Sequence, residues 1–458
     1  MNSAIIPYLK EQQVLTPDER RAAGKALRNI IPRSSHAAWS PAPDRPDPIS
    51  LLEESDSTRL ASLVPIRYGR MLTSPFAFLR GSAAIMAYDL SQTPTTGLLV
   101  QACGDAHLSN FGLYATPERS EVFDVNDFDE TLPGPWEWDV KRLVTSIVVA
   151  ARNNSFPEAV SRQAALKGAQ MYREHMEVYG TMRHLDVWYS RVTAENVLKS
   201  VRSGNRVSLS REIEKAHRRT SAHIFPKLTT ESKGQYTIKD DPPLIVHLDD
   251  ATLADTLRGL VEGYVASLPD DRQVLLSRYH VLDLAQKVVG VGSVGTRCYV
   301  VLLLGDDSND PLFLQIKEAQ PSVFERYLGA SHYSNHAQRV VCGQRLVQAA
   351  SDIFLGWTRI GSTDYYIRQL HDRSLSPSIE IMGTRDFIGF AGLCGWVLAR
   401  AHARSGDPAQ MSSYLGRNDM FDQAVTSFAM TYAHQVEQDY AALAAAARSG
   451  RIHAQTEL

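Results

Sequence analysis

Residues 104–110 read Gly-Asp-Ala-His-Leu-Ser-Asn, and residues 122–130 read Val-Phe-Asp-Val-Asn-Asp-Phe-Asp-Glu. The first stretch places Asp105 five residues before Asn110, and the second places a cluster of acids at the end of a short apolar run. Phosphoryl transfer uses this set of groups. One carboxylate orients the attacking hydroxyl, while an amide and a second carboxylate hold Mg²⁺ against the phosphates of a nucleotide. The two stretches therefore predict a catalytic loop followed by a metal-binding loop.

The second stretch contains four acids within seven residues, Asp124, Asp127, Asp129 and Glu130. They repel one another unless solvent or a cation screens them, and the apolar run before them argues against a purely solvated segment. A divalent cation bound by oxygen ligands, Mg²⁺ or Mn²⁺, is the economical explanation. We expect Asp127 to be a ligand because it follows the predicted strand, with Asp129 or Asp124 as alternatives and Asn110 as the amide ligand.

The loop around Asp105 also has a plainer interpretation, a turn held by local side-chain hydrogen bonds. His107 is either a donor to phosphate or a residue that supports this loop. Asp139 follows a Pro-Gly-Pro turn near the start of a predicted helix. There it either caps the helix or accepts backbone amides of the Asp105 loop. We expect His402, on another predicted helix, to be structural.

A glycine-rich pattern, Gly290-x-Gly292-x-x-Gly295, forms a second signal. A hairpin turn without a ligand is one interpretation. A dinucleotide-binding fold would place a helix after the glycines, but the run that follows, 296–304, is apolar and β-branched and favours a strand. A glycine-rich turn between two strands, with a lysine on the third strand, is the arrangement of a protein-kinase nucleotide loop.

Lys317 is the lysine in question, at the end of the apolar sequence Phe-Leu-Gln-Ile-Lys. A lysine in such a strand needs a partner if the strand faces a cleft. We expect that partner to be Glu325, because side chains alternate along a strand and Glu318 points to the opposite face. Lys317 would then neutralise the phosphates of a nucleotide.

Three arginines, Arg67, Arg70 and Arg80, flank the sequence Ser-Pro-Phe-Ala-Phe. They form either an anion-binding site or ordinary surface charge, and we expect surface charge.

The composition is ordinary for a globular protein: 458 residues, 44% hydrophobic, 22% charged and a net charge of −3. This charge gives no indication of a nucleic-acid or membrane partner. The four cysteines are far apart, with no Cys-x-x-Cys pair, so we expect no disulfide framework or zinc site. The first thirty residues are too polar for a signal peptide, and no apolar run is long enough for a membrane span. We expect a cytoplasmic protein.

Apolar spacing and turn residues predict the elements. Helices are expected at 16–30, 79–90, 136–153, 159–176, 253–279, 322–354, 387–404 and 421–448. Strands are expected at 98–103, 121–127, 287–304 (two strands around the glycine turn), 311–317 and 364–370. A proline-rich linker is expected at 40–47, and an exposed, charged excursion at 203–243.

The motifs of the two acidic stretches resemble those of the aminoglycoside and choline phosphotransferase branch of the kinase-like superfamily. The chain is also identified as a member of an uncharacterised bacterial family catalogued as domain of unknown function 2252. That likeness rests on sequences such as GDAHLSNFG, NDFDETLPGPWEWDVKRL, VVGVGSVGTR and ARAHARSGD, and it runs from about residue 65 to 440.

The resemblance to the phosphotransferases implies a role for each motif residue. Asp105 would be the catalytic base, aided by His107 and Lys317. The metal ligands would be Asn110 and Asp127, with Asp129 beside them. Asp139 would support the catalytic loop. The nucleotide would be bound by Gly290, Gly292, Ser293, Gly295, Lys317 and Glu325.

Two features depart from the phosphotransferase pattern. Cys103 stands where those enzymes commonly have histidine, and the glycine turn and lysine follow the catalytic loop instead of preceding it. A circular permutation accommodates this order. The expected fold is therefore α+β, a permuted bilobal kinase-like fold with a small antiparallel β lobe and a larger helical lobe. The expected parts are an N-terminal extension at 1–60, helical-lobe segments at 61–280 and 373–458, and a β-rich nucleotide lobe at 281–372.

The leading functional hypothesis is an ATP- and Mg²⁺-dependent phosphotransferase that acts on a hydroxyl of a small molecule or a protein. A nucleotidyltransferase that binds ATP in reverse remains an alternative. So does a metal-dependent hydrolase using Asp105, His107, Asp124 and Asp127, and so does a non-catalytic nucleotide-binding protein. The sequence leaves the acceptor and the oligomeric state open.

Overall fold

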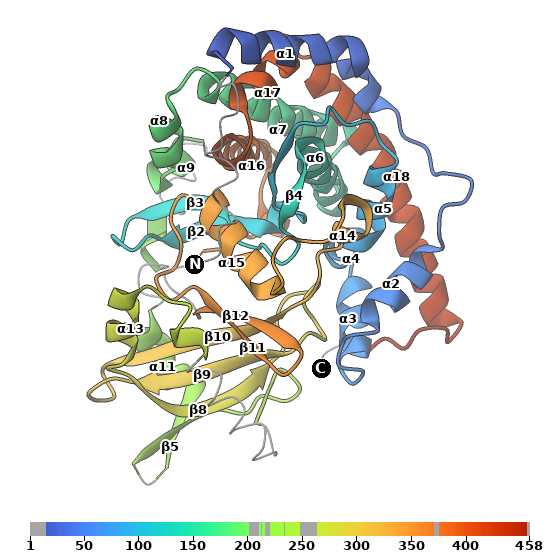
Figure 1. Ribbon diagram of the computed structural model, residues 1–458. Helices are drawn as coiled ribbons and strands as arrows, with labels where there is room; N and C mark the ends of the chain where they lie inside the picture. Colours follow the sequence, from blue (N-terminus) through green and yellow to red (C-terminus); the bar gives the residue numbers. More distant parts are fainter. Residues whose placement is uncertain are drawn as a thin grey trace.

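The chain folds into a mixed α+β structure in which a six-stranded antiparallel sheet lies at one end of a large group of helices (Figure 1). The computed structural model describes residues 15–200, 210–211, 213–215, 220–232, 234–247, 263–370 and 375–455. The predicted α+β class is confirmed, and small antiparallel sheets accompany the main one.

The main sheet has the strand order β11-β12-β10-β9-β8-β7. Its strands are β7 (Ile245–His247), β8 (His280–Lys287), β9 (Cys298–Leu304), β10 (Pro311–Ala319), β11 (Gly356–Ile360) and β12 (Thr363–Gln369). The predicted strand after the glycine turn, the lysine strand and the strand at 364–370 are confirmed. The strand before the turn was predicted too late in the sequence, because β8 ends at Lys287, where the predicted strand begins. The sheet also extends outside residues 281–372, because β7 is its edge strand.

The centre of the sheet is buried on both faces. Every residue of β9 is buried, which explains its unbroken apolar sequence. Its side chains alternate between two separate cores, as strand geometry requires. Tyr299 and Val301 belong to one core, and Val300 and Leu302 belong to the other.

Four long helices form the middle of the helical part: α6 (Trp136–Asn153), α7 (Glu158–Tyr179), α16 (Thr384–Ser405) and α18 (Met420–Arg448). Each coincides with a predicted helix to within a few residues. Helix α6 is buried along nearly its whole length. Helices α7 and α16 come into direct backbone contact, because a Cβ on Gly395 would lie only 2.0 Å from the backbone oxygen of Gly168. Only glycine permits this approach.

Shorter helices cover this centre. They are α1 (Pro17–Ile30), α2 (Pro48–Asp56), α3 (Val64–Met71), α4 (Pro75–Gly81), α5 (Ala83–Ser91), α8 (His184–Tyr189), α9 (Ala194–Ser200), α11 (Ser221–Leu228), α13 (Asp270–Leu276), α14 (Glu325–Leu328), α15 (His336–Val347) and α17 (Pro408–Leu415). The 3₁₀ helices among the described residues are η2 (Arg33–Ala37), η3 (Leu108–Asn110) and η4 (Ile379–Ile381). The predicted helix at 16–30 is confirmed, and Thr16 closes its start with Glu19 in a capping box.

The described part of the chain also contains three two-stranded antiparallel sheets. They pair β1 (Leu99–Ala102) with β4 (Leu132–Pro135), β2 (Phe111–Ala115) with β3 (Glu121–Val125), and β5 (Thr229–Ser232) with β6 (Gln235–Ile238). Strands β1 and β3 confirm two predicted strands, and each leads directly into one of the two acidic stretches.

Some local predictions were wrong. The helix predicted at 322–354 is broken into α14 and α15, because the chain turns at Gly329, whose φ of 94° favours glycine. The excursion predicted at 203–243 contains α11, β5 and β6 in its described part. Residues 201–209, 216–219 and 251–262 lie outside the described residues, together with the part of the helix predicted at 253–279 that falls there.

The proline-rich segment 40–47 forms neither helix nor strand but is tied to the core. Arg45 makes ion pairs with Asp89, at 2.8 Å, and with Asp439, at 2.7 Å. All three side chains are almost completely buried, so this segment fastens α5 to α18.

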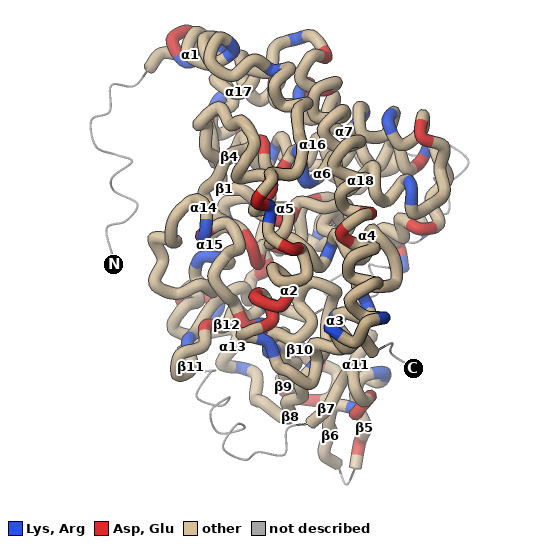
Figure 2. The backbone as a smooth tube through the Cα atoms, turned by 90° about the vertical axis from the view of Figure 1, so that its right-hand side faces the viewer, with Lys and Arg blue, Asp and Glu red and all other residues tan. Residues whose placement is uncertain are grey.

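Lysine and arginine positions are interspersed with aspartate and glutamate over the backbone in Figure 2. Within the described part of the chain, no helix combines the length and apolar composition needed to cross a membrane. The four cysteines are free, as predicted.

Candidate functional site

A cavity of about 500 Å³ brings together five parts of the chain that are far apart in sequence. They are the helical segment at 51–84, the loop after β1, the loop after β3, the glycine-rich loop after β8, and residues 318–327. The predicted site residues on its wall are Asp105, His107, Asn110, Asp127, Asp129, Gly290, Gly292, Ser293 and Glu325.

Asp139, in the first turn of α6, binds the backbone of the loop that carries Asp105. Its carboxylate accepts the backbone N–H of Cys103 at 2.6 Å and of Gly104 at 3.0 Å. His402 of α16 lies 3.2 Å from the same carboxylate. Asp139 is fully buried. Of its two predicted roles, the structure shows the contact with the backbone amides of the loop, and His402 has the structural position expected of it.

Asp105 faces the cavity with its carboxylate already oriented. Arg142 of α6 donates to Oδ1 from Nε at 2.8 Å and lies 2.7 Å away through Nη2. His107 Nε2 is 3.6 Å from Oδ2. Burial raises the pKa of Asp105, while Arg142 and Arg80 act in the opposite direction. A carboxylate whose pKa is raised in a cavity is suited to accept a proton.

His107 is buried beside Asp105, with its Nδ1 unpaired among the described residues. Burial lowers the pKa of His107 well below its ordinary value, and the charges of Arg80 and Arg142 add to this effect. The imidazole is therefore neutral at pH 7. A neutral imidazole favours a role for His107 in shaping the loop over a role as a cationic hydrogen-bond donor to phosphate.

Asn110 and Asp127 present oxygen atoms to the same cavity. The amide nitrogen of Asn110 donates to the backbone oxygen of Asp105 at 2.7 Å, which leaves its amide oxygen for another partner. Asp127 makes no ion pair with any described residue. Burial raises the pKa of Asp127, and the neighbouring charge of Asp129 raises it further.

Lys317 is buried and its ammonium binds Asp129, at 2.8 Å, rather than Glu325. The predicted pairing with Glu325 was wrong, because the loop after β3 places Asp129 next to the ammonium of Lys317. Tyr366 of β12 donates to the other oxygen of Asp129 at 2.6 Å. Burial opposes the charge of Lys317, but Asp129 holds its pKa well above the ordinary value. The pKa of Asp129 is lowered: burial acts against this, but Lys317 outweighs it.

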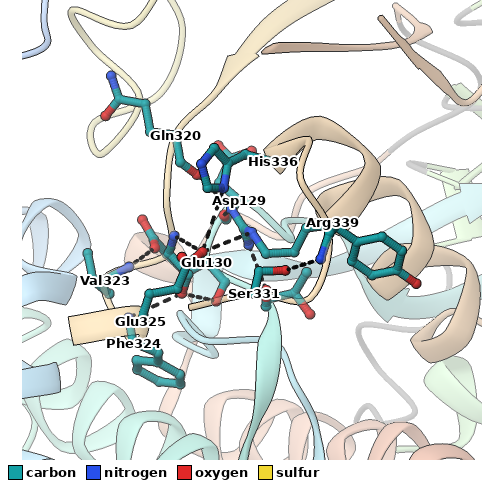
Figure 3. A network of polar contacts seen from close by, with 12 residues as sticks. Asp129, Glu130, Gln320, Val323, Phe324, Glu325, Ser331, His336 and Arg339 are labelled. Carbon is teal, nitrogen blue, oxygen red and sulfur yellow. Dashed lines mark hydrogen bonds and ion pairs between the residues drawn. The ribbon is translucent and has the colours of Figure 1, made fainter. Parts of the chain in front are cut away.

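Glu325 takes part in a different network, drawn in Figure 3. Its Oε1 accepts the backbone N–H of Ser322 at 3.1 Å and lies 3.7 Å from Arg339 Nε. Arg339 in turn donates to the backbone oxygens of Asp129 (2.8 Å) and Gln320 (2.7 Å). This network fixes the loop after β3 against the segment after β10.

Glu130 lies in the same network and on the cavity wall. Its Oε2 accepts the backbone N–H of Val323 at 2.7 Å. Burial raises the pKa of Glu130 to about 7, although the N–H of Val323 acts in the opposite direction.

The glycine-rich loop is held over the cavity by the helical segment at 51–84. Arg59 donates to the backbone oxygen of Val294 at 2.6 Å, and Arg70 donates to that of Gly290. Gly290 and Gly295 have φ values of 68° and 93°, which favour glycine. Ser293 Oγ lies 3.5 Å from Asp129, so the loop reaches the acids directly.

Asp124, one of the alternative metal ligands, is not on the cavity wall. It is fully buried, and both its oxygens bind Arg400 Nη2 of α16, at 2.7 and 2.8 Å. It also accepts the backbone N–H of Ala349 at 2.8 Å. The structure therefore separates Asp124, an internal ion-pair partner, from Asp127 and Asp129, which face the cavity.

Sequence reasoning missed the contribution of the N-terminal arginines. Arg67 is buried and binds Asp56, Arg70 binds the glycine-rich loop, and Arg80 lines the cavity. The expectation of surface charge was wrong. The signal was the apolar sequence Phe-Ala-Phe-Leu before Arg80, because a buried helix carries its flanking arginines into the interior.

The arrangement places an oriented carboxylate, two oxygen donors and a glycine-rich loop around one cavity, and the buried Lys317 binds Asp129 of the cavity wall. No curated protein and no solved structure matches the chain. A family of bacterial proteins described as "Uncharacterized protein conserved in bacteria (DUF2252)" matches residues 59–446, which include every element of this cavity beyond α2. The chain belongs to the DUF2252 family.

Proposed function

We propose that this protein is an ATP- and Mg²⁺-dependent phosphotransferase of the kinase-like type. One observation carries the proposal. Lys317, which follows the glycine-rich loop, binds an acid of the metal-binding loop across 188 positions of sequence, beside the cavity that Asp105 faces. The two sequence motifs that predict a nucleotide site are thus in contact, which supports the proposal.

Asp105 is the base of the proposed reaction. The acceptor hydroxyl gives its proton to the Asp105 carboxylate as its oxygen forms a bond to the γ-phosphorus of ATP. The bond between that phosphorus and the β–γ bridging oxygen breaks, and the bridging oxygen keeps the electron pair and leaves as part of ADP. Arg142 holds the carboxylate in place, and the raised pKa of Asp105 favours its role as proton acceptor.

Asn110 and Asp127 fit the role of Mg²⁺ ligands by the chemistry of their donors. Both offer the hard oxygen atoms that this ion prefers. Asp127 makes no ion pair with a described residue, although the charges of Lys317 and Arg368 act on it. No group of three or more His, Cys, Asp or Glu side chains suited to a metal exists in the described part of the chain. This agrees with a site that takes its remaining ligands from phosphate and water. When bound, the cation would neutralise charge on the phosphates.

Two contacts support a permuted kinase-like chain order. Residues 392–404, in α16, resemble the helix that leads into the catalytic loop in the phosphotransferases. Here the end of α16 and the strand before the catalytic loop are adjacent in space, since Gln101 of β1 donates its backbone N–H to Ser405 Oγ at 3.0 Å. A Cβ on Gly406 would lie 3.1 Å from the backbone oxygen of Leu99. These two contacts support the proposed permutation, because a permuted chain still needs the end of α16 beside β1.

The hydrolase alternative is weakened because Asp124, one of its four groups, is bound to Arg400 inside the protein. It would also leave the glycine-rich loop and Lys317 without a role. A nucleotidyltransferase remains chemically possible with the same residues, and the products of the reaction distinguish it, since it releases pyrophosphate instead of ADP.

Thermal unfolding in the presence of nucleotide tests the proposal first. ATP with Mg²⁺ should raise the melting temperature, and Mg²⁺ alone should not. ATP consumption with a panel of hydroxyl acceptors should then depend on Asp105. We expect Asp105→Asn to lose at least about 100-fold in rate and to keep the nucleotide-induced shift. Asp186→Asn, at an exposed position paired with Arg183, is the matched control. Absence of any shift with ATP and Mg²⁺ would reject the proposal.

A further inference from the structure

Arg80 stands out among the arginines of the cavity because no described residue is its hydrogen-bond or ion-pair partner. It lies at the end of α4 and lines the cavity, and its Nε is buried without a hydrogen-bond partner. Its guanidinium makes no hydrogen bond or ion pair with another described residue. By contrast, Arg67 donates a hydrogen bond to Asp56, and Arg59 donates one to the backbone oxygen of Val294.

The surroundings of Arg80 are those of the proposed phosphate end of the nucleotide. A Cβ on Gly292 would lie 3.1 Å from the backbone oxygen of Arg80, so the glycine-rich loop packs against the end of α4. The charges of Asp105 and Asp127 act on the guanidinium, although neither is within ion-pair distance. Arg80 thus shares the cavity with the proposed base and the proposed metal ligand.

Keeping a charged guanidinium without a partner in this partly buried place costs free energy, because the group has lost part of its hydration. Burial lowers the pKa of Arg80, and the nearby carboxylates only partly offset this effect. Arginine keeps its proton under all ordinary conditions, so it cannot escape the cost by becoming neutral. An anion that enters the cavity would remove the cost, and a planar guanidinium is matched to the paired oxygens of a phosphoryl group.

We propose that Arg80 binds the γ-phosphoryl group of the nucleotide and stabilises it during transfer. This inference rests on the proposed function and adds a catalytic residue to it, an arginine supplied by the N-terminal segment of the same chain. As the acceptor oxygen bonds to phosphorus and the bridging oxygen leaves with ADP, charge shifts among the oxygens around phosphorus. Arginines in this position accelerate phosphoryl transfer by roughly 10³–10⁵-fold in other nucleotide enzymes.

The charges of both Asp105 and Asp127 act on Arg80, which favours the transferring group over an anionic part of the acceptor as its ligand. The base binds the attacking hydroxyl and the metal ligand lies on the nucleotide side, so the group between them is the one that moves. Binding of ADP and of a non-hydrolysable ATP analogue with an imido β–γ bridge separates the two possibilities, because only the analogue carries a γ-phosphate.

The test is titration calorimetry of both nucleotides, with Mg²⁺, on the full-length protein and on Arg80→Gln. We expect the variant to bind the analogue at least about tenfold more weakly and to bind ADP within about twofold of the unmodified protein. Arg80→Lys should recover part of the loss, since it keeps the charge without the planar fork. Arg417→Gln removes an arginine that is 90% exposed and serves as the matched control.

The outcomes distinguish the inference from the function on which it rests. If the unmodified protein binds both nucleotides and Arg80→Gln weakens neither, or weakens both equally, the role of Arg80 is refuted and the phosphotransferase proposal stands. If the unmodified protein binds neither nucleotide, both are refuted. If Arg80→Gln does not fold, Arg80→Lys decides the matter, and unchanged affinity for the analogue refutes the inference.

Discussion

Lys317 Nζ lies 2.8 Å from Asp129 Oδ2, although the two residues are 188 positions apart. The pair joins the β10 strand to the loop after β3, and Tyr366 completes the environment of the acid. Phosphates that enter the cavity would compete with Asp129 for the ammonium. The strength of the pair therefore affects both the stability of the fold and the affinity for nucleotide.

Replacing Lys317 by Met should reduce both the stability of the fold and the affinity for nucleotide. Adding Asp129→Asn should restore only the stability. Lys317→Met leaves Asp129 without its counter-ion, so we expect the free energy of unfolding to fall by about 1–3 kcal/mol and ATP affinity to fall at least about tenfold. Adding Asp129→Asn should restore stability but leave nucleotide binding weak. Urea denaturation and calorimetry measure the two effects. Full recovery of binding in the double variant would contradict a direct role for Lys317.

Asp124 and Asp127 should respond in opposite ways to the same substitution. Asp124→Asn breaks a fully buried ion pair with Arg400 and should cost about 3–5 kcal/mol of stability. Asp127→Asn should leave the urea midpoint nearly unchanged, because Asp127 has no ion pair among the described residues. It should instead abolish the thermal shift that requires Mg²⁺ with ATP. A large loss of stability in Asp127→Asn would argue for a structural acid.

Gly290→Ala tests the glycine-rich loop, with Gly97→Ala as its control. Both glycines have positive φ, 68° and 78°, so alanine strains the backbone at each by about 1 kcal/mol. A Cβ at Gly97 meets nothing within 4 Å, and one at Gly290 meets only Ser293 at 3.8 Å. We expect similar losses of stability but weaker ATP binding only in Gly290→Ala. Equal ATP affinity in the two variants would contradict a role for the glycine-rich loop in nucleotide binding.

Glu130 should make the protein less stable as pH rises. Its pKa is raised by burial to about 7 in the folded state, against 4.5 as its ordinary value. Between these values the unfolded chain releases a proton that the folded chain keeps, so unfolding becomes easier with increasing pH, by at most about 1.4 kcal/mol per pH unit.

Glu130→Gln should remove this dependence between about pH 5 and 7. Urea denaturation across that range measures it. Glu158→Gln is the control, because the pKa of Glu158 is lowered by Arg152 and its effect falls at more acidic pH. Identical slopes for the unmodified protein and Glu130→Gln would show that Glu130 titrates normally.

Much of the local structure was predictable because it follows from short-range patterns. The period of apolar residues located α6 and α18 almost to the residue, and the β-branched run at 298–304 identified β9. Strand β4 was missed because its sequence, Leu-Pro-Gly-Pro, has no strand preference, and it forms only because β1 offers a partner.

The partners of charged residues were harder to predict, since they depend on how distant elements pack. Glu325 is close to Lys317 in sequence and Asp129 is far away, yet the loop after β3 lies nearer in space. The burial of Arg67 and of the Nε atom of Arg80 likewise results from the packing of α3 and α4 against other parts of the chain.

The hydrogen bond between Gln101 and Ser405 has a consequence for biosynthesis. The strand that leads to Asp105 leaves the ribosome some three hundred residues before the helix end that completes its surroundings. His402, the buried neighbour of Asp139, emerges equally late. In a nascent chain, the loop that carries Asp105 therefore lacks its contacts with α16 until translation has passed residue 405. Shielding of the immature N-terminal segment by chaperones during that interval would protect it from aggregation.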